Sequence, residues 1–404
     1  MKLSEELQWR GFIHQTTYKD LSVLDSESIT FYWGVDPSAD SMTVGHLAVA
    51  MMIRRFIESG HKAILLVGGA TGLIGDPDGK KQERDLKTTE EVEKNVAGLV
   101  NQYKAIFDGE EFETVNNYDW FKSLGYLDFL REIGKHLSMT QLLDREFVKT
   151  RIGEGGAGIS YAEFSYSLIQ GYDFLHLFRE KGVTLQVCGA DQWGNSLAGV
   201  EMIRKLEGGE AHVYSTPLII NKTTGVKFGK SEEGAVWLDE KKTSVYKFYQ
   251  FWLNVDDVGV EDYLKIYTSI MPHELDPLLQ ELAEHPEQRA AQKYLAFEVT
   301  KLVHGEEKAK SAQKVTETLF SDSSVTDLSA EELEMLANEI PTAQAGNLIN
   351  ILVSSKVASS NGEARRLVQG NGVSVNGSKV TQDAQVNAPS LIKKGKNTFV
   401  LVKS

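Results

Sequence analysis

Residues 28–72 read SITFYWGVDPSADSMTVGHLAVAMMIRRFIESGHKAILLVGGATG, and the order of elements in this stretch decides the fold. Residues 28–34 are rich in β-branched and aromatic side chains and end in glycine, which predicts a strand. Apolar residues then recur at helical spacing from Val44 to Ser59, and Gly60 ends that helix. Residues 62–67 are apolar after one lysine, as in a buried strand. Strand, helix and strand in this order predict a right-handed unit with a parallel sheet.

Three further patterns bear on the fold. Residues 184–188, followed by Gly189, predict another strand of the sheet. The stretch between these strands, about residues 87–180, is predicted to be largely helical. Residues 373–380 alternate in the manner of a hairpin.

The connection between this first strand and its helix has the composition of a phosphate site. A helix N-terminus presents unpaired N–H groups and a positive dipole end, both of which suit phosphates. Gly45 leaves room for a nucleotide base or sugar to approach the backbone. His46 can donate a hydrogen bond to a phosphate or ribose oxygen. Taken alone, the same pair also fits a turn glycine followed by a surface histidine.

A second segment, Lys227-Phe-Gly-Lys230-Ser231, lies about 180 residues further on in a glycine-containing loop. Its lysines supply point charges for a polyphosphate, although a solvated basic turn has the same composition. Residues 75–84 form a third candidate loop that adds Lys80 and Arg84. Together the three segments fit attack of a carboxylate on the α-phosphate of ATP. That reaction needs no general base, because a carboxylate is already ionised at pH 7.

Length and composition limit the other possibilities. A chain of 404 residues is expected to form two or three domains. Its one cysteine, Cys188, excludes an intramolecular disulfide and a multi-cysteine metal site. No apolar run reaches the roughly 20 residues that span a bilayer, so we expect a cytoplasmic protein with no membrane partner.

Charge is unevenly distributed along the chain. The net charge is −14, yet residues 341–404 carry eight basic and two acidic side chains. We therefore expect an acidic body joined to a basic C-terminal segment that has a polyanionic partner.

Several longer segments resemble those of class I aminoacyl-tRNA synthetases of the bacterial tyrosyl type. The matching segments are residues 36–41, 67–77, 117–120, 163–166, 170–173 and 189–195 and the lysine loop. The resemblance covers essentially the whole chain and implies an α/β fold. A Rossmann-like parallel-sheet catalytic domain with an inserted helical dimerisation segment is implied over residues 1–225. The lysine loop and a helical domain follow over 226–320, a linker over 321–341, and a small α+β RNA-binding domain of the S4 type over 342–404.

The resemblance also implies which residues bind tyrosine. Tyr32 and Asp173 are implied as partners of its phenol and Tyr166 and Gln170 as partners of its ammonium group, with Asp76 supplying negative charge. Gln192 is implied as a further neighbour of the substrate. Independently of the resemblance, Tyr166, Gln170 and Asp173 have the spacing i, i+4 and i+7, which places them on one helix face. An ordinary amphipathic helix has the same spacing.

Further contacts are implied for ATP and for the transition state. The implied ATP contacts are Asp36, Gly45, His46, Asp191, Lys230 and Ser231. The groups implied to stabilise the reacting phosphate and the pyrophosphate are Thr43, His46, Lys80, Arg84, Lys227 and Lys230. Mg²⁺ is expected to arrive with the nucleotide and not in a protein cage.

Two positions depart from the usual pattern of the family. Histidine is most common at the position of Thr43, and we expect threonine to keep one hydrogen bond to phosphate. Cysteine is common at the position of Trp33, so the indole either turns away or contributes only its backbone.

The resemblance implies tRNA(Tyr), L-tyrosine and ATP as substrates, and a homodimer. Arg204 and Lys205 are implied as contacts to the acceptor stem, and Lys356, Arg365 and Arg366 as contacts of the basic C-terminal segment. Residues 125–180 are a candidate dimer interface, although the same apolar pattern fits an ordinary core.

Two other interpretations remain open at this point. One is another class I adenylate-forming enzyme, such as a tryptophanyl synthetase or a small nucleotidyltransferase. The other is a non-enzymatic RNA-binding protein that retains a decayed synthetase body, which Thr43 alone favours.

Overall fold

The computed structural model describes residues 1–77, 86–143, 146–153, 155–231, 234–320 and 324–403. The chain forms two compact units. One comprises Met1–Thr243 and Val255–Leu295, and the other comprises Ser244–Asn254 and Ala296–Ser404. Within the ranges described, no helix has the length and apolar character needed to cross a bilayer.

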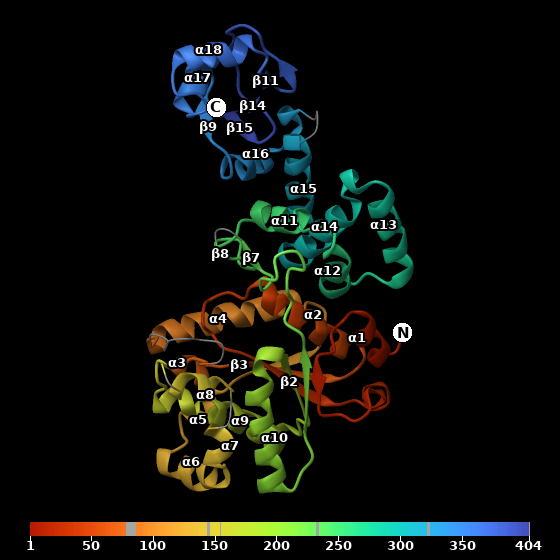
Figure 1. The fold of residues 1–404 in the computed structure, drawn as a ribbon, viewed down its shortest axis with the longest axis vertical. Helices are drawn as coiled ribbons and strands as arrows, with labels where there is room; N and C mark the ends of the chain where they lie inside the picture. Colours follow the sequence, from red (N-terminus) through yellow and green to blue (C-terminus); the bar gives the residue numbers. More distant parts are fainter. Residues whose placement is uncertain (78–85, 144–145, 154, 232–233, 321–323, 404) are drawn as a thin grey trace. The chain divides into compact units, whose positions relative to one another are not determined.

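A six-stranded sheet organises the first unit, in the order β1-β6-β5-β2-β3-β4. Its strands β2 and β3 are labelled in Figure 1. The strands are β1 Gln15–Thr16, β2 Thr30–Val35, β3 Lys62–Val67, β4 Phe112–Asn116, β5 Leu185–Gly189 and β6 His212–Thr216. Strands β2 to β6 run parallel, and β1 pairs antiparallel with β6. The sheet grows from β2 toward β4 on one side and through β5 toward β6 on the other. The carboxyl ends of β2 and β5 therefore form a topological switch point.

Helices and one small hairpin complete this unit. The helices are α1 Leu3–Trp9, α2 Val44–Glu58, α3 Thr71–Ile74, α4 Thr89–Ile106, α5 Tyr118–Phe121, α6 Tyr126–Glu132, α7 Met139–Leu143, α8 Glu146–Ile152, α9 Tyr161–Lys181, α10 Trp193–Glu207, α12 Val260–Tyr267 and α13 Pro272–Glu284. Short 3-10 turns are η1 Leu21–Asp25, η2 Gly134–His136, η3 Ala190–Gln192 and η4 Pro286–Gln288. The hairpin is β7 Lys230–Ser231 with β8 Gly234–Ala235, and α14 Ala290–His304 spans the boundary between the units.

The fold class predicted from the sequence is confirmed. The strands expected near 28–34, 62–67 and 184–188 and the helix that begins at Val44 are all present. The expectation of a largely helical stretch over 87–180 is wrong at β4, which pairs with β3. Side chains of β4 are half-buried or exposed at the edge of the sheet, so no continuous apolar run marks this strand.

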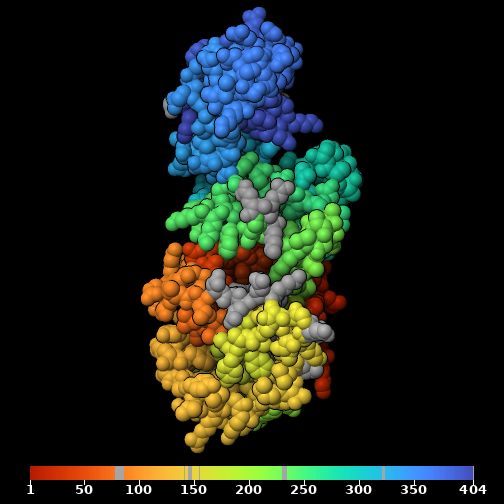
Figure 2. All heavy atoms as spheres, turned by 60° about the vertical axis from the view of Figure 1, so that its left-hand side comes forward, coloured from red at the N-terminus to blue at the C-terminus, as the bar shows by residue number. Residues whose placement is uncertain are grey.

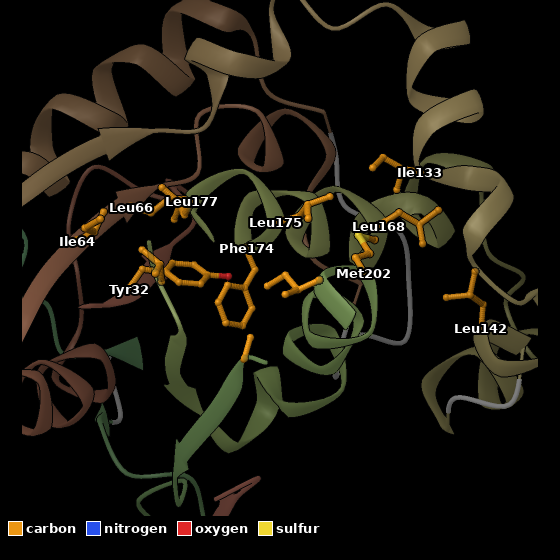
Figure 3. Packing of buried hydrophobic residues seen from close by; sticks show 13 residues of the cluster. Tyr32, Ile64, Leu66, Ile133, Leu142, Leu168, Phe174, Leu175, Leu177 and Met202 are labelled. Carbon is orange, nitrogen blue, oxygen red and sulfur yellow. The ribbon is translucent and has the colours of Figure 1, made fainter. Parts of the chain in front are cut away.

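Side chains of β2 alternate between two helical layers, as expected for a strand buried on both faces. The Phe31 ring packs on α2 and the Trp33 ring on α4, at centroid separations of 5.3 and 5.6 Å. Tyr32, between them, packs on Phe174 of α9 at 5.3 Å. Figure 3 shows Tyr32 within a cluster of buried apolar side chains that includes residues of α9 and α10. Strand alternation thus directs Tyr32 toward α9.

Helices α9 and α10 approach closely because glycines face bulkier residues across the interface. A Cβ at Gly171 would lie 2.7 Å from the Met202 methyl group, and one at Gly199 would lie 2.6 Å from Phe174 Cβ. Such close packing leaves little freedom for α9 to shift or rotate. The three predicted site residues that α9 carries are therefore held on a rigid element.

The second unit ends in a small α+β module. The helices of the second unit are α11 Val245–Leu253, α15 Glu306–Phe320, α16 Ala330–Ala337, α17 Leu348–Ser354 and α18 Asn361–Gln369, with a 3-10 turn η5 Val325–Asp327. Its strands are β9 Thr342–Gln344, β10 Gly346–Asn347, β11 Val373–Val375, β12 Ser378–Lys379, β13 Gln385–Val386, β14 Ser390–Lys394 and β15 Thr398–Lys403. Five of them form a mixed sheet in the order β12-β11-β14-β15-β9.

The hairpin predicted near residues 373–380 is present as β11 and β12. The stretch expected as a linker, 321–341, contains the turn η5 and helix α16. Leu336 of α16 is buried in one cluster with Leu319 of α15 and Leu401 of β15. Apolar packing therefore ties this stretch to the C-terminal sheet.

Candidate active site

Asp36 is the first residue after β2, and its carboxylate joins three elements. Its Oδ1 accepts the Thr71 hydroxyl at 2.6 Å, and its Oδ2 accepts the Tyr166 hydroxyl at 2.7 Å. Gly68, directly after β3, permits this approach, because a Cβ there would lie 2.3 Å from Asp36 Oδ1. The carboxyl ends of β2 and β3 and one face of α9 therefore meet at Asp36.

Asp173 lies two turns further along α9 and is only 2% exposed. Its Oδ1 accepts the indole N–H of Trp120 at 2.9 Å, and its Oδ2 accepts an amide N–H of Asn117 at 3.0 Å. Burial raises the pKa of Asp173 to about 8, and the two hydrogen bonds oppose that shift. An unfolded aspartate ionises near pH 4, so stability is lost as the pH rises from about 4 through 8. A residue kept at such a cost is a functional-site candidate.

Neither Asn117 nor Trp120 is among the predicted site residues. Both belong to a segment that entered the sequence argument only through the resemblance. Their N–H groups are ordinary hydrogen-bond donors, and more than 50 residues separate each of them from Asp173. Only the path of the chain after β4 brings these donors to the carboxylate.

The buried polar atoms Tyr32 Oη and Gln170 Oε1 have no hydrogen-bond partner among the described residues. Burial, together with the nearby Asp173 carboxylate, raises the pKa of Tyr32. The phenol is therefore a hydrogen-bond donor at neutral pH. Leaving buried polar atoms unpaired costs free energy, so both atoms are candidate ligand contacts.

A second polar group forms where β5 ends. Gln192 donates from Nε2 to Asp76 Oδ2 at 2.7 Å, and Asn195 donates from Nδ2 to Gln192 Oε1 at 3.3 Å. Asp191, in the same 3-10 turn as Gln192, forms an exposed ion pair with Lys227 at 3.4 Å. This group borders the same edge of the sheet as Asp36.

The N-terminus of α2 presents His46 in a defined tautomer. His46 Nδ1 accepts the Thr43 backbone N–H at 3.1 Å and also lies 3.1 Å from the Thr43 hydroxyl. Desolvation lowers the pKa of His46, although the residue is exposed on the surface of this chain. The accepted N–H and the lowered pKa both favour a neutral ring with its proton on Nε2. A Cβ at Gly45 would meet only Thr43 Oγ1, at 3.6 Å, so protein packing does not require glycine there.

The lysine loop and the residues that follow it pack against this same helix end, and a Cβ at Gly229 would lie 2.5 Å from Val44 Cγ2. Val44 N–H donates to Val236 O at 3.1 Å, and Thr43 forms an antiparallel bridge with Trp237. Both motifs that suggested ATP chemistry therefore meet in the first unit. The backbones of Lys230 and Ser231 form β7, but their side chains lie outside the described residues, as do Lys80 and Arg84.

Trp33 does not contribute its side chain to this edge. The indole is 3% exposed and packs on Tyr103 of α4, on the face of the sheet opposite Tyr32. Of the two alternatives for Trp33, the structure therefore has the one in which the side chain turns away.

Predicted tRNA contacts lie on both units. On α10, Arg204 is exposed, and Lys205 pairs with Glu201 at 2.7 Å and donates to His136 O at 3.0 Å. In the second unit, Arg365 and Arg366 are exposed on α18 and Lys356 is exposed after α17.

Comparisons with known proteins agree along the whole chain. Residues 24–321 match the family model described as tRNA synthetases class I (W and Y). Residues 332–403 match the model described as the tyrosine–tRNA ligase SYY-like C-terminal domain. The tyrosine–tRNA ligase of Geobacillus stearothermophilus is 44% identical over 422 residues, with 100% of each chain covered. That of Bacteroides fragilis is 42% identical, with 100% of this chain and 99% of the other covered.

Solved structures give the same picture. A C-terminally truncated mitochondrial tyrosyl-tRNA synthetase of Aspergillus nidulans matches with a TM-score of 0.71 and 30% identity, covering 79% of this chain and 94% of the other. A tyrosyl-tRNA synthetase of Archaeoglobus fulgidus, complexed with L-tyrosine, shares the fold at a TM-score of 0.57 and 15% identity, covering 77% and 100%.

The chain thus belongs to the class I tRNA synthetases of the tryptophan and tyrosine group. Within that group its family is that of the tyrosine–tRNA ligases, as the full-length relatives and the C-terminal match show. Its activity is tyrosine–tRNA ligation with ATP.

Proposed function

We propose that the phenol of L-tyrosine binds between Tyr32 and Asp173. The observation that carries this proposal is the hydrogen bonding of the buried Asp173 carboxyl group, in which each oxygen accepts one N–H group. An ionised carboxylate has about four acceptor sites, so room remains for the substrate hydroxyl. The unpartnered Tyr32 hydroxyl supplies a donor to the same phenol oxygen. Tyrosine therefore satisfies groups that phenylalanine leaves unpaired.

Proton linkage follows from the raised pKa of Asp173. The carboxylate that accepts the phenol is the ionised form, which becomes the minor form below a pKa of about 8. Tyrosine affinity is therefore expected to fall as the pH decreases from 8 toward 6. Binding of the phenol favours the ionised form and lowers the pKa of Asp173 in the complex.

The ammonium group of tyrosine is proposed to bind beside Tyr166, Gln170 and Asp76. Tyr166 is held by Asp36, and Asp76 is held by Gln192, so both are fixed before substrate arrives. Gln170 Oε1 is buried without a partner in the described structure and can accept one ammonium N–H. Gln192 and Asp36 are proposed to border the substrate carboxylate and the ribose.

ATP is proposed to lie across the N-terminus of α2 and the lysine loop. His46 can donate from Nε2 to a phosphate oxygen because its Nδ1 is already an acceptor. Lys227 supplies positive charge, and Lys80, Arg84, Lys230 and Ser231 remain proposed contacts that lie outside the described side chains. Mg²⁺ is proposed to enter as the counter-ion of the phosphates.

The reaction proceeds in two transfers. A tyrosine carboxylate oxygen bonds to the α-phosphorus as the bond to the bridging oxygen breaks, which releases pyrophosphate. Positive groups fixed in advance stabilise the charge that develops on the phosphate oxygens. The 3′-terminal ribose hydroxyl of tRNA(Tyr) then takes the tyrosyl group and releases AMP. We also propose that the enzyme acts in the cytoplasm, because the sequence has no apolar run of the roughly 20 residues that span a bilayer.

Lys227→Ala should lower tyrosine-dependent ATP–pyrophosphate exchange by about 100-fold, because it removes charge from the transition state. Lys222→Ala is a matched control, since both lysines form exposed ion pairs, with lysine side chains 53% and 47% exposed and aspartates 43% exposed in each pair. Exposed pairs contribute little stability, so both variants should unfold like wild type. Wild-type exchange with tryptophan instead of tyrosine, or equal rates in the two variants, would contradict the assignment.

The basic C-terminal module is proposed to bind the sugar–phosphate backbone of tRNA. Arg365 and Arg366 are exposed on α18, where Glu363 interacts electrostatically with Arg366. Cations on such a surface release counter-ions from RNA and contribute affinity that depends on salt. Arg204 and Lys205 are proposed as acceptor-stem contacts on the other unit.

Changing Arg365 and Arg366 to glutamate should raise the KM for tRNA by at least about tenfold and weaken its salt dependence. Pyrophosphate exchange, which needs no tRNA, should be unchanged. A control with the same change in charge is Lys19→Glu with Lys62→Glu, two exposed lysines of the catalytic unit. An unchanged KM for tRNA in the Arg365/Arg366 variant would show that these residues of the module do not contribute to tRNA binding.

We also propose a homodimer formed through the segment between β4 and the first turn of α9. Atoms of this segment, orange to yellow, form part of the surface shown in Figure 2. Large apolar side chains are exposed in it, namely Tyr118, Tyr126, Leu127, Met139, Leu143, Ile152 and Tyr161. An exposed apolar group of this size is typical of an interaction surface.

Tyr161→Asp should dissociate the dimer in sedimentation velocity, because it would bury a charge in an apolar interface. Val258→Asp is the control, since Val258 is 68% exposed and Tyr161 is 62% exposed but Val258 lies outside this segment. Wild-type protein that sediments as a monomer at micromolar concentration would refute the proposed dimer.

A further inference from the structure

Phe228, between the two loop lysines, is buried, whereas Val226 and Lys227 directly before it are exposed. Its side chain is 7% exposed and stacks on Tyr263 of α12, with ring centroids 4.2 Å apart and planes 22° from parallel. It also contacts Tyr267, one turn further along α12, at 6.0 Å. A single residue therefore fixes the middle of the lysine loop to an aromatic platform.

The platform is joined directly to the N-terminus of α2. Tyr267 is 1% exposed and donates from its hydroxyl to the Val44 carbonyl at 3.2 Å. Val44 is the first residue of the helix that presents His46. One aromatic residue thus contacts both the lysine loop and the phosphate-facing helix end.

Close backbone packing completes this junction. Gly229 has φ of +95°, and a Cβ there would lie 2.5 Å from Val44 Cγ2. Its carbonyl accepts the Val236 N–H at 3.0 Å, and the Val236 carbonyl accepts the Val44 N–H. Any residue other than glycine would strain the loop and push it away from α2.

Helix α12 is itself held in place by Arg10, the residue that directly follows α1. The Arg10 guanidinium is buried and donates to the carbonyls of Lys265, Thr268 and Ile270 at 2.6, 3.0 and 3.1 Å. These carbonyls lie at and just beyond the C-terminal end of α12, where helices leave acceptors unpaired. Since α12 is fixed, docking of Phe228 determines where the adjacent loop backbone lies.

We propose that Phe228, Tyr263 and Tyr267 form an aromatic latch that positions the lysine loop over the N-terminus of α2 during tyrosine activation. Phe228 and Tyr267 are positioning residues in this account, because they act through Lys227 and the loop backbone. The inference rests on the proposed role of the loop in binding the ATP phosphates. It adds that catalysis depends on aromatic packing of Phe228 and on the hydrogen bond from Tyr267 to Val44, neither of which touches a substrate.

The test compares Phe228→Leu and Tyr267→Phe with wild type in ATP–pyrophosphate exchange, with tyrosine affinity measured separately. Each variant should lower kcat by at least about tenfold, because a small displacement of a charged group is costly in the transition state. Tyrosine affinity should stay within twofold, since the tyrosine site lies on α9. Phe248→Leu, which removes a buried aromatic ring from the second unit, should leave kcat unchanged.

A double-mutant cycle separates positioning from general loss of stability. In the Lys227→Ala background, Phe228→Leu should have a much smaller effect, because the charge that it misplaces is already absent. Equal effects of Phe228→Leu in both backgrounds, or wild-type kinetics for Tyr267→Phe, would overturn the latch. If Phe228→Leu does not fold, the kcat of Tyr267→Phe in ATP–pyrophosphate exchange alone tests the latch. A wild-type protein without tyrosine-dependent exchange would refute the proposed function itself.

Discussion

Parallel pairing of β2 to β6 is the constraint on which the rest of this structure depends. Parallel strands end at one edge, and the change of direction between β2 and β5 opens a crevice there. Asp36 after β2, Gly68 after β3 and Asp191 after β5 come from distant parts of the sequence. The sheet alone brings them to one edge. The candidate site residues lie at the ends of the strands and in the loops that follow them, and the buried strands fix the positions of those loops.

At this edge the protein retains arrangements that cost stability. The Asp173 carboxyl is desolvated, and the Tyr32 hydroxyl and Gln170 amide oxygen are buried with no partner in the part of the chain described. Close packing of α9 on α10 offsets these costs, because apolar burial there is extensive. The same packing keeps the polar groups from relaxing toward one another. We propose that a ligand with a phenol at one end and an ammonium group at the other supplies the missing partners.

The sequence predicted what depends on local pattern. A continuous apolar run predicted β3, and apolar residues at helical spacing after a polar turn predicted α2. β4 was missed because its half-exposed residues at the sheet edge carry no continuous apolar run. Asn117 and Trp120 were missed as site residues because a donor's partner is set by tertiary structure. Aromatic packing of Phe228 on α12 is likewise invisible in the sequence, since a phenylalanine between two lysines has no local partner.

The most direct test of the central claim is a calorimetric titration of wild-type protein with L-tyrosine and with L-phenylalanine, at pH 8 and without ATP. The two ligands differ only in the hydroxyl that Tyr32 and Asp173 are proposed to bind. The account predicts that tyrosine binds more tightly than phenylalanine by at least about tenfold, because phenylalanine leaves the buried Tyr32 hydroxyl without a partner and gives Asp173 no third hydrogen bond. Equal affinities would contradict it, and would mean that the buried carboxyl of Asp173 does not recognise the substrate.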